Sequence, residues 1–108
     1  MINKIKEFSE RFINTNKSII KNNDRVEING NISKWYYYNT DIVTMDKDKN
    51  KVIFNLSYSS ISTLKRLNYA VSALNLKYSI VIKNGMYAVR NENNEKLEIK
   101  NNLITLPL

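Results

Sequence analysis

Hydroxyl and basic side chains gather in one short stretch of the chain, where together they could bind an anion. Ser60, Ser62 and Thr63 open the strongest helix signal, and Lys65 and Arg66 follow directly. Hydroxyl groups at such a position satisfy the free N–H groups of a helix's first turn. The same N–H groups, with two cations beside them, suit a phosphate. Two interpretations therefore stay open: an anion site, or a helix cap on a solvated face.

One side of this helix is a candidate binding surface. Ser62, Lys65, Arg66 and Tyr69 are expected to share much of the exposed side. Arg66 and Tyr69 are three residues apart, so they can stack on one another. Such a side could contact a backbone phosphate or an acidic partner; the alternative is an ordinary solvated helix face.

A run of four aromatic residues is the second candidate. On a strand, Trp35 and Tyr37 would point to one face of the sheet and Tyr36 and Tyr38 to the other, beside Lys34. Exposed aromatics near cations can stack on the bases of single-stranded nucleic acid. They can equally anchor a protein interface. The structural alternative is a core pair on one face and cross-strand aromatic packing on the other.

The residue types that are missing exclude several kinds of site. The chain has no Cys and no His, so it can form neither disulfides, nor His- or Cys-ligated zinc sites, nor Ser-His or Cys-His nucleophile systems. Its ten carboxylates are scattered, and no spacing selects a catalytic pair. We therefore expect a protein that is not an enzyme and that has no cofactor and no metal.

The polar segment 46–50 begins like a calcium loop, with acidic or amide groups at alternate positions. Lys51, however, stands where such a loop needs glycine, and Ser57 replaces its final glutamate. A hairpin turn is the better interpretation.

The balance of charge points to anionic partners. Lys and Arg number 17 and Asp and Glu number 10, a formal net charge of +7. A positive field favours nucleic acid, an acidic protein or an acidic membrane surface. The other explanation is that AT-rich coding raises the Lys content together with that of Asn, Ile and Tyr.

Two helices and several hairpins must position these residues. An N-terminal helix over residues 2–13 would bury Ile2, Ile5, Phe8 and Phe12, and a central helix would bury a stripe made of Ile61, Leu64, Leu67, Val71 and Leu74. Residues 18–21 either restart the first helix or begin a loop. Strands are expected over 25–28, 32–38, 41–45, 52–56, 78–83, 86–90, 97–99 and 103–106. Asn29-Gly30 and Asn84-Gly85 predict two tight hairpin turns.

This pattern predicts an α+β domain: an antiparallel, hairpin-built sheet with one central helix packed on a face and an N-terminal amphipathic helix. We expect a single domain over residues 1–108, with an N-terminal helix region (1–24), hairpins (25–56), the central helix (57–76) and a C-terminal hairpin with short strands (77–108).

The start of the central helix also carries a family resemblance. The run Tyr58-Ser59-Ser60-Ile61-Ser62-Thr63-Leu64-Lys65-Arg66-Leu67-Asn68 resembles a segment in small bacteriophage proteins of uncharacterised function. In those proteins two Thr stand where this chain has Ser62 and Thr63. The likeness extends loosely over residues 35–43 and 87–89. It implies a small accessory protein of a phage or prophage, a class of protein that commonly acts by binding.

The leading hypothesis is therefore nucleic-acid binding through a basic and aromatic face, with Lys34, Trp35, Tyr36, Tyr38, Ser62, Lys65, Arg66 and Tyr69 as candidate contacts. The alternative is an inhibitor of a host factor or defence nuclease, of the anti-CRISPR type. Self-association as a homodimer through an edge strand such as 103–106 is a third hypothesis. The first residues do not read as a signal peptide and no stretch reaches a membrane-spanning length, so we expect a protein of the host cytoplasm without a membrane partner.

Overall fold

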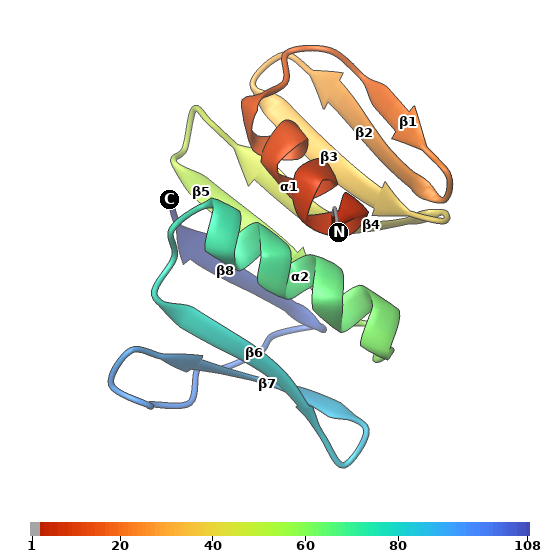
Figure 1. The fold of residues 1–108 in the computed structure, drawn as a ribbon. Coiled ribbons are helices and arrows are strands. Elements are labelled where there is room, and N and C mark those ends of the chain that lie inside the picture. The colour runs from red at the N-terminus through yellow and green to blue at the C-terminus, as the bar shows by residue number, and fades with distance from the viewer. Residues whose placement is uncertain (1–2) are drawn as a thin grey trace.

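A computed structural model describes residues 3–108, which form two helices and eight strands (Figure 1). In chain order these are α1 (Lys4–Asn14), β1 (Ile19–Lys21), β2 (Asp24–Asn29), β3 (Ile32–Tyr37), β4 (Thr40–Asp46), β5 (Lys51–Asn55), α2 (Ile61–Ala73), β6 (Tyr78–Lys83), β7 (Met86–Asn91) and β8 (Leu103–Pro107). The predicted α+β class is confirmed, including the N-terminal and the central helix. Ile2, which the sequence placed in the first helix, lies outside the described residues.

Six strands form one antiparallel sheet in the order β1-β2-β3-β4-β5-β8. The first five follow one another through hairpins, and β8 returns from the C-terminal part of the chain to pair with β5. β6 and β7 form a separate two-stranded sheet. β8 is therefore an edge strand of the larger sheet, and self-association through it stays a prediction.

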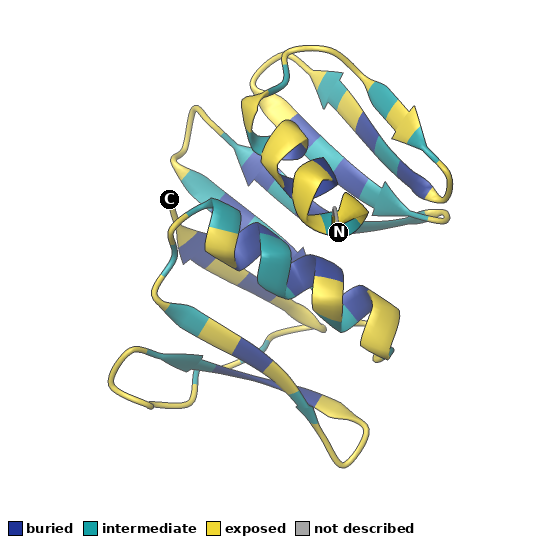
Figure 2. Ribbon diagram, in the orientation of Figure 1, coloured by how far each residue is buried: buried dark blue, intermediate teal, exposed yellow. Residues whose placement is uncertain are grey.

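Both helices lie side by side over one face of the six-stranded sheet, and the β6–β7 hairpin lies on the side of α2 away from α1 (Figure 1). Buried and exposed residues alternate along β8, as expected for a sheet covered on one face only (Figure 2). At the centre of the core the indole of Trp35 contacts two rings of α1, with ring centroids 5.4 Å from Phe8 and 5.7 Å from Phe12. The other face of the sheet is open.

The helices begin at side-chain caps. The Asn3 side chain accepts a hydrogen bond from the Lys6 backbone N–H at the start of α1, and Ser60 accepts one from the Thr63 N–H at the start of α2. The cap predicted from the hydroxyl residues is thus confirmed for Ser60. The buried side of α2 is made by Thr63, Arg66, Leu67, Ala70 and Val71.

Left-handed backbone conformations shape the turns, and asparagine supplies most of them. Both predicted hairpin turns are present: Gly30 has φ 61°, and Asn84 and Gly85 have φ 54° and 75°. Seven asparagines in the described part of the chain take positive φ, which asparagine tolerates better than other residues with a Cβ. The high Asn content therefore has a structural use. Residues 47–50 form the predicted turn between β4, which ends at Asp46, and β5.

Three details of the prediction are wrong. Within residues 18–21, predicted as helix or loop, Ile19–Lys21 is a strand that pairs with β2 across a turn that begins at Asn22, where φ is 55°. Ile61 is not part of the buried stripe: it is the first residue of α2 and is 66% exposed. Residues 97–99 form no strand; only isolated bridges flank them, although Leu97 and Ile99 still pack against the core.

Within residues 3–108, no helix has both the length and the apolar character needed to cross a membrane.

Candidate functional site

Two neighbouring hollows lie at the end of the sheet where α2 begins. The first, which we call the aromatic pocket, has a volume of about 450 Å³ and lies between the β3–β4 turn and the start of α2. Its walls are Tyr37, Tyr38, Asn39, Thr40, Ile42, Tyr58, Ser60, Ser62 and Thr63. Three tyrosines and several hydroxyls thus face one space, whose volume is in the range of roughly 300–1,000 Å³ usual for small-ligand sites.

Two of the three tyrosines are largely open to solvent. Tyr38 is 59% exposed and Tyr58 is 67% exposed. Tyr37 is half-buried, and its ring centroid lies 4.7 Å from that of Tyr38. Exposed aromatic rings at the rim of a hollow are available to stack on a planar ligand.

The backbone at Tyr38 is held in an unfavourable conformation. Its φ is 55°, which is uncommon for a bulky residue, and the cost is of the order of 1–3 kcal/mol. The Tyr38 N–H donates to the Asn23 carbonyl oxygen at 2.8 Å, so the β3–β4 turn is fastened to the β1–β2 turn. Such outliers cluster at ligand sites, which makes this turn a candidate for function.

The loop before α2 is fastened from β7. The Tyr87 hydroxyl donates a 2.7 Å hydrogen bond to the Tyr58 carbonyl oxygen. Burial raises the pKa of the Tyr87 hydroxyl above its ordinary value of 10.0, while a backbone hydrogen bond at Ser60 acts in the opposite direction. The Ser60 hydroxyl donates to Thr63 Oγ1 at 2.8 Å. The backbone that carries Tyr58 is therefore tied to a second sheet and leads directly into the helix cap.

A buried ion pair forms the wall behind Tyr37. Arg66 donates from Nε to Asp24 Oδ1 at 2.7 Å and from Nη2 to Asp24 Oδ2 at 2.9 Å, and both side chains are only 10% exposed. Trp35 Nε1 donates to the same carboxylate at 2.9 Å. The guanidinium also lies 3.7 Å from the centroid of the Tyr37 ring. Arg66 thus orders the inner side of the aromatic pocket.

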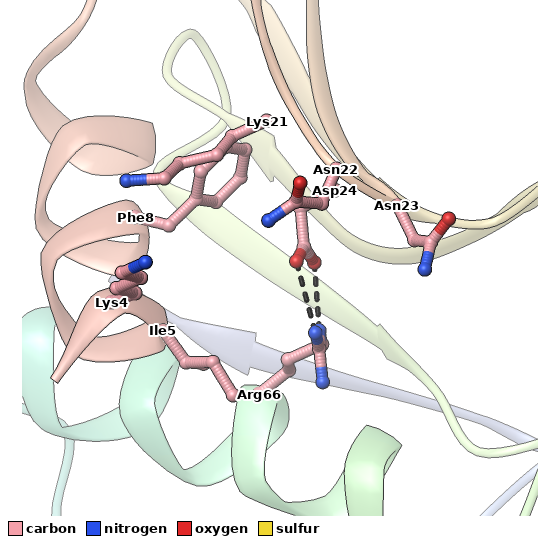
Figure 3. Close-up of a pocket in the computed structure, with 8 residues that line it drawn as sticks. All are labelled: Lys4, Ile5, Phe8, Lys21, Asn22, Asn23, Asp24 and Arg66. Atoms are coloured by element: carbon pink, nitrogen blue, oxygen red, sulfur yellow. Dashed lines mark hydrogen bonds and ion pairs between the residues drawn. The ribbon is translucent and has the colours of Figure 1, made fainter.

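The second hollow, which we call the basic recess, has Arg66 in its own lining (Figure 3). It has a volume of about 530 Å³, and Lys4, Ile5, Phe8, Lys21, Asn22, Asn23, Asp24 and Arg66 line it. Figure 3 shows Lys4 reaching the recess from α1 and Lys21 from the strand side, with the Asp24–Arg66 pair as the opposite wall. In the described part of the chain, neither lysine has a salt-bridge partner.

The predicted site residues fall into separate places. Trp35 is fully buried and Arg66 is almost so, hence neither presents a surface to a partner in this structure. The predicted stacking of Arg66 on Tyr69 is wrong, because Arg66 lies over Tyr37 instead. Thr63 is also buried, so the anion site proposed for solvent-facing Thr63 and Arg66 does not exist in that form.

The other predicted contacts lie on three surfaces. Lys34 and Tyr36 are on the open face of the sheet, where Glu27 lies opposite Lys34 in the register and Arg25 is ion-paired with Glu27. Of the two cations on this strand pair, Arg25 is thus paired with a carboxylate.

Tyr38 and Ser62 line the aromatic pocket. Lys65 is exposed and Tyr69 half-buried on α2, where the Asn3 side-chain amide donates to the Tyr69 hydroxyl.

Sequence reasoning missed Tyr37, Tyr58, Lys4 and Lys21 as site residues. Tyr58 opens the helix-start run that carries the family resemblance, so a signal for it was present. Lys4 and Lys21 belong to different elements, and nothing local marks them. Among residues 3–108, no group of three carboxylates lies close enough to hold a metal ion.

The segments that carry the resemblance meet at the aromatic pocket. Residues 37–42 and 58–63 supply its walls, and Tyr87 binds the Tyr58 carbonyl oxygen. In comparisons with known proteins, neither a curated protein nor a solved structure matched the chain. The model of the Kyanoviridae Gp96 protein family matches residues 2–105. With nearly all of its length matched, the chain belongs to the Kyanoviridae Gp96 protein family of bacteriophage proteins.

Proposed function

We propose that this phage protein acts in the host cytoplasm by binding single-stranded nucleic acid, without catalysis, at the end of the sheet where the aromatic pocket and the basic recess adjoin. The observation that carries the proposal is the pair of exposed rings, Tyr38 and Tyr58, at the rim of a single pocket. Binding of single strands without a sequence code combines aromatic stacking platforms with cations that follow the backbone.

The chemistry of the pocket suits a nucleobase. Tyr38 and Tyr58 offer two ring faces, and the hydroxyls of Ser62 and Thr40 can both donate and accept hydrogen bonds at a base edge. Because the β1–β2 turn holds Tyr38 through Asn23 and the helix cap holds the backbone at Ser60, little order has to be imposed on binding.

The charges near the pocket suit the phosphates. Lys4 and Lys21 line the adjoining recess, and Lys65 is exposed on α2. Asp24 is the one carboxylate in the two linings given above, and both of its oxygens already accept hydrogen bonds from Arg66. Within these two linings a strand would therefore meet cations and no free carboxylate.

The test is fluorescence anisotropy with labelled single-stranded DNA and RNA of about 12 nucleotides, a length within the usual site size. Tyr58→Ala should weaken binding about 5- to 150-fold, the loss expected for one stacked base at 1–3 kcal/mol. Affinity should also fall steeply between about 50 and 200 mM salt.

Tyr36→Ala is the matched control, because it removes the same side chain from the open face of the sheet. It should bind like the unmodified protein. A loss with Tyr36→Ala and none with Tyr58→Ala would move the interface to the open face and refute the site. If no single strand binds at low salt, the proposed function is wrong.

A protein partner is the second candidate, and one observation favours it. Ile61, which follows Ser60 of the pocket wall in the chain, is an exposed aliphatic residue, and exposed apolar and aromatic side chains can together anchor a protein interface. An inhibitor of a host factor or defence nuclease, of the anti-CRISPR type, would use this surface. Pull-down from host lysate after nuclease treatment should then recover one stoichiometric partner, and Tyr58→Ala should lose it while Tyr36→Ala keeps it.

A further inference from the structure

We infer that the basic recess binds a terminal phosphate, the phosphomonoester group at the end of a single strand. The inference rests on the proposed function and adds to it a preference for phosphorylated ends. Its basis is a concave site in which two lysines without a carboxylate partner, Lys4 and Lys21, meet from α1 and β1.

The charge of the recess matches a phosphomonoester. Lys4, Lys21 and Arg66 contribute three positive charges and Asp24 one negative charge, which leaves a formal charge of +2 on the lining. A phosphomonoester carries about −1.5 to −2 near pH 7, whereas a phosphodiester inside a strand carries a single charge. The group that neutralises the recess is therefore a strand end.

Asp24 does not cancel this field. Its two oxygens accept hydrogen bonds from Arg66 at 2.7 and 2.9 Å, and Oδ1 also accepts one from Trp35 Nε1. The carboxylate is thus bound on the core side, and its charge is matched by the guanidinium. The ammonium groups of Lys4 and Lys21 remain as the two uncompensated charges of the lining, on the far side of the recess from the ion pair (Figure 3).

The lining of the recess also offers a neutral hydrogen-bond donor to a phosphate. It is a hollow of about 530 Å³ between α1 and the β1–β2 turn, and the Asn22 amide side chain lies at its wall beside Asp24 (Figure 3). Amide N–H groups can donate to phosphate oxygens. The Tyr38 N–H is bonded to the Asn23 carbonyl oxygen, so a nucleotide in the aromatic pocket has the recess as its neighbour.

The experiment compares three versions of one oligonucleotide, with a 5′-phosphate, with a 3′-phosphate and with hydroxyl groups at both ends. One phosphorylated version should bind about tenfold more tightly than the hydroxyl version, since each ammonium–phosphate contact near solvent contributes roughly fivefold or less. Which end is preferred gives the polarity of the bound strand. Inorganic phosphate should remove the advantage when it replaces chloride at equal ionic strength.

The double variant Lys4→Gln/Lys21→Gln should weaken binding of all three versions, since the same lysines also face backbone phosphates, and should bring the ratio of affinities between the phosphorylated and hydroxyl versions to about one. Lys47→Gln/Lys49→Gln is the matched control: it removes the same charge from exposed lysines of the β4–β5 turn, outside both hollows, and should keep the preference.

Equal affinities for all three versions, or a preference that survives Lys4→Gln/Lys21→Gln, would overturn the inference while the proposed function stands. If none of the three oligonucleotides binds, the proposed function itself fails. The two failures are therefore distinguishable.

Discussion

Replacing Arg66 by methionine should strongly destabilise the protein. Met has a similar length and is apolar, so the change removes the guanidinium and leaves the volume nearly filled. The Asp24 carboxylate, with 10% of its side chain exposed, would lose two hydrogen bonds and its counter-charge and keep only the Trp35 N–H. An uncompensated buried charge is the main cost of such a change.

The magnitude follows from the burial of the pair. Breaking a buried ion pair by removal of one partner costs about 3–5 kcal/mol. A domain of this size unfolds with a free energy of about 5–15 kcal/mol, so the variant loses a large share of its stability. At roughly 4–8 °C per kcal/mol, its Tm should fall by roughly 12–40 °C.

Urea unfolding followed by circular dichroism measures the free energies, and a double-mutant cycle isolates the pair. Asp24→Asn removes the carboxylate charge that Arg66→Met leaves without a partner. The double variant Asp24→Asn/Arg66→Met should therefore lose less free energy of unfolding than the two single variants together, by about 0.5–3 kcal/mol. Arg25→Met is the control, since its ion pair with Glu27 has 33% and 53% of the two side chains exposed and should be worth less than about 1 kcal/mol. A loss for Arg66→Met no larger than for Arg25→Met, or strict additivity in the cycle, would refute the reasoning.

Four further substitutions test other parts of the structure. Ser60→Ala removes the N-cap of α2 and should lower the free energy of unfolding by about 0.5–2 kcal/mol in the same urea experiment, whereas an unchanged value would mean that water replaces the cap. Tyr87→Phe removes the hydrogen bond to the Tyr58 carbonyl oxygen and should cost about 1 kcal/mol near neutral pH. Because burial raises the pKa of Tyr87 above 10.0, its neutral hydroxyl stabilises the folded state below that pH, and the contribution is lost as pH rises through the raised pKa; urea titrations on either side of pH 10 should show a smaller alkaline loss in Tyr87→Phe than in the unmodified protein. Ile61→Ala should change stability by less than about 0.5 kcal/mol and Leu67→Ala by about 2–5 kcal/mol, and similar losses for both would restore the apolar stripe predicted from the sequence.

Local chemistry was enough to predict most of the fold. Asn84-Gly85 and the turn at Gly30 need positive φ, which few residues accept, so both hairpins were visible in the sequence. The period-two pattern around Val26 and the helical spacing of Leu67 and Val71 identified β2 and α2 for the same reason: each pattern follows from the geometry of one element. The strand at residues 19–21 was not predicted, because three residues are too few to show a period-two pattern and their pairing depends on β2.

The candidate site depended on contacts between distant parts of the chain. The sequence predicted that Arg66 is an exposed cation, because arginine is rarely buried without a partner. Its partner Asp24 lies 42 residues earlier in the chain, so nothing local indicates the pair. The sequence did find Tyr38 and Ser62, but not that they share a pocket with Tyr58.

What the sequence by itself determined is the set of elements, the exclusion of His and Cys chemistry and the positive net charge, since all of these follow from residue types and near neighbours. Only the tertiary structure decided which charged side chains are neutralised by a partner inside the protein and which have no such partner. Arg66 is neutralised by Asp24 inside the protein, whereas Lys4 and Lys21 are brought to one recess without a carboxylate partner among the described residues. The physical reason is that an electrostatic site is defined by distance and burial in space, and the order of residues along a chain fixes neither.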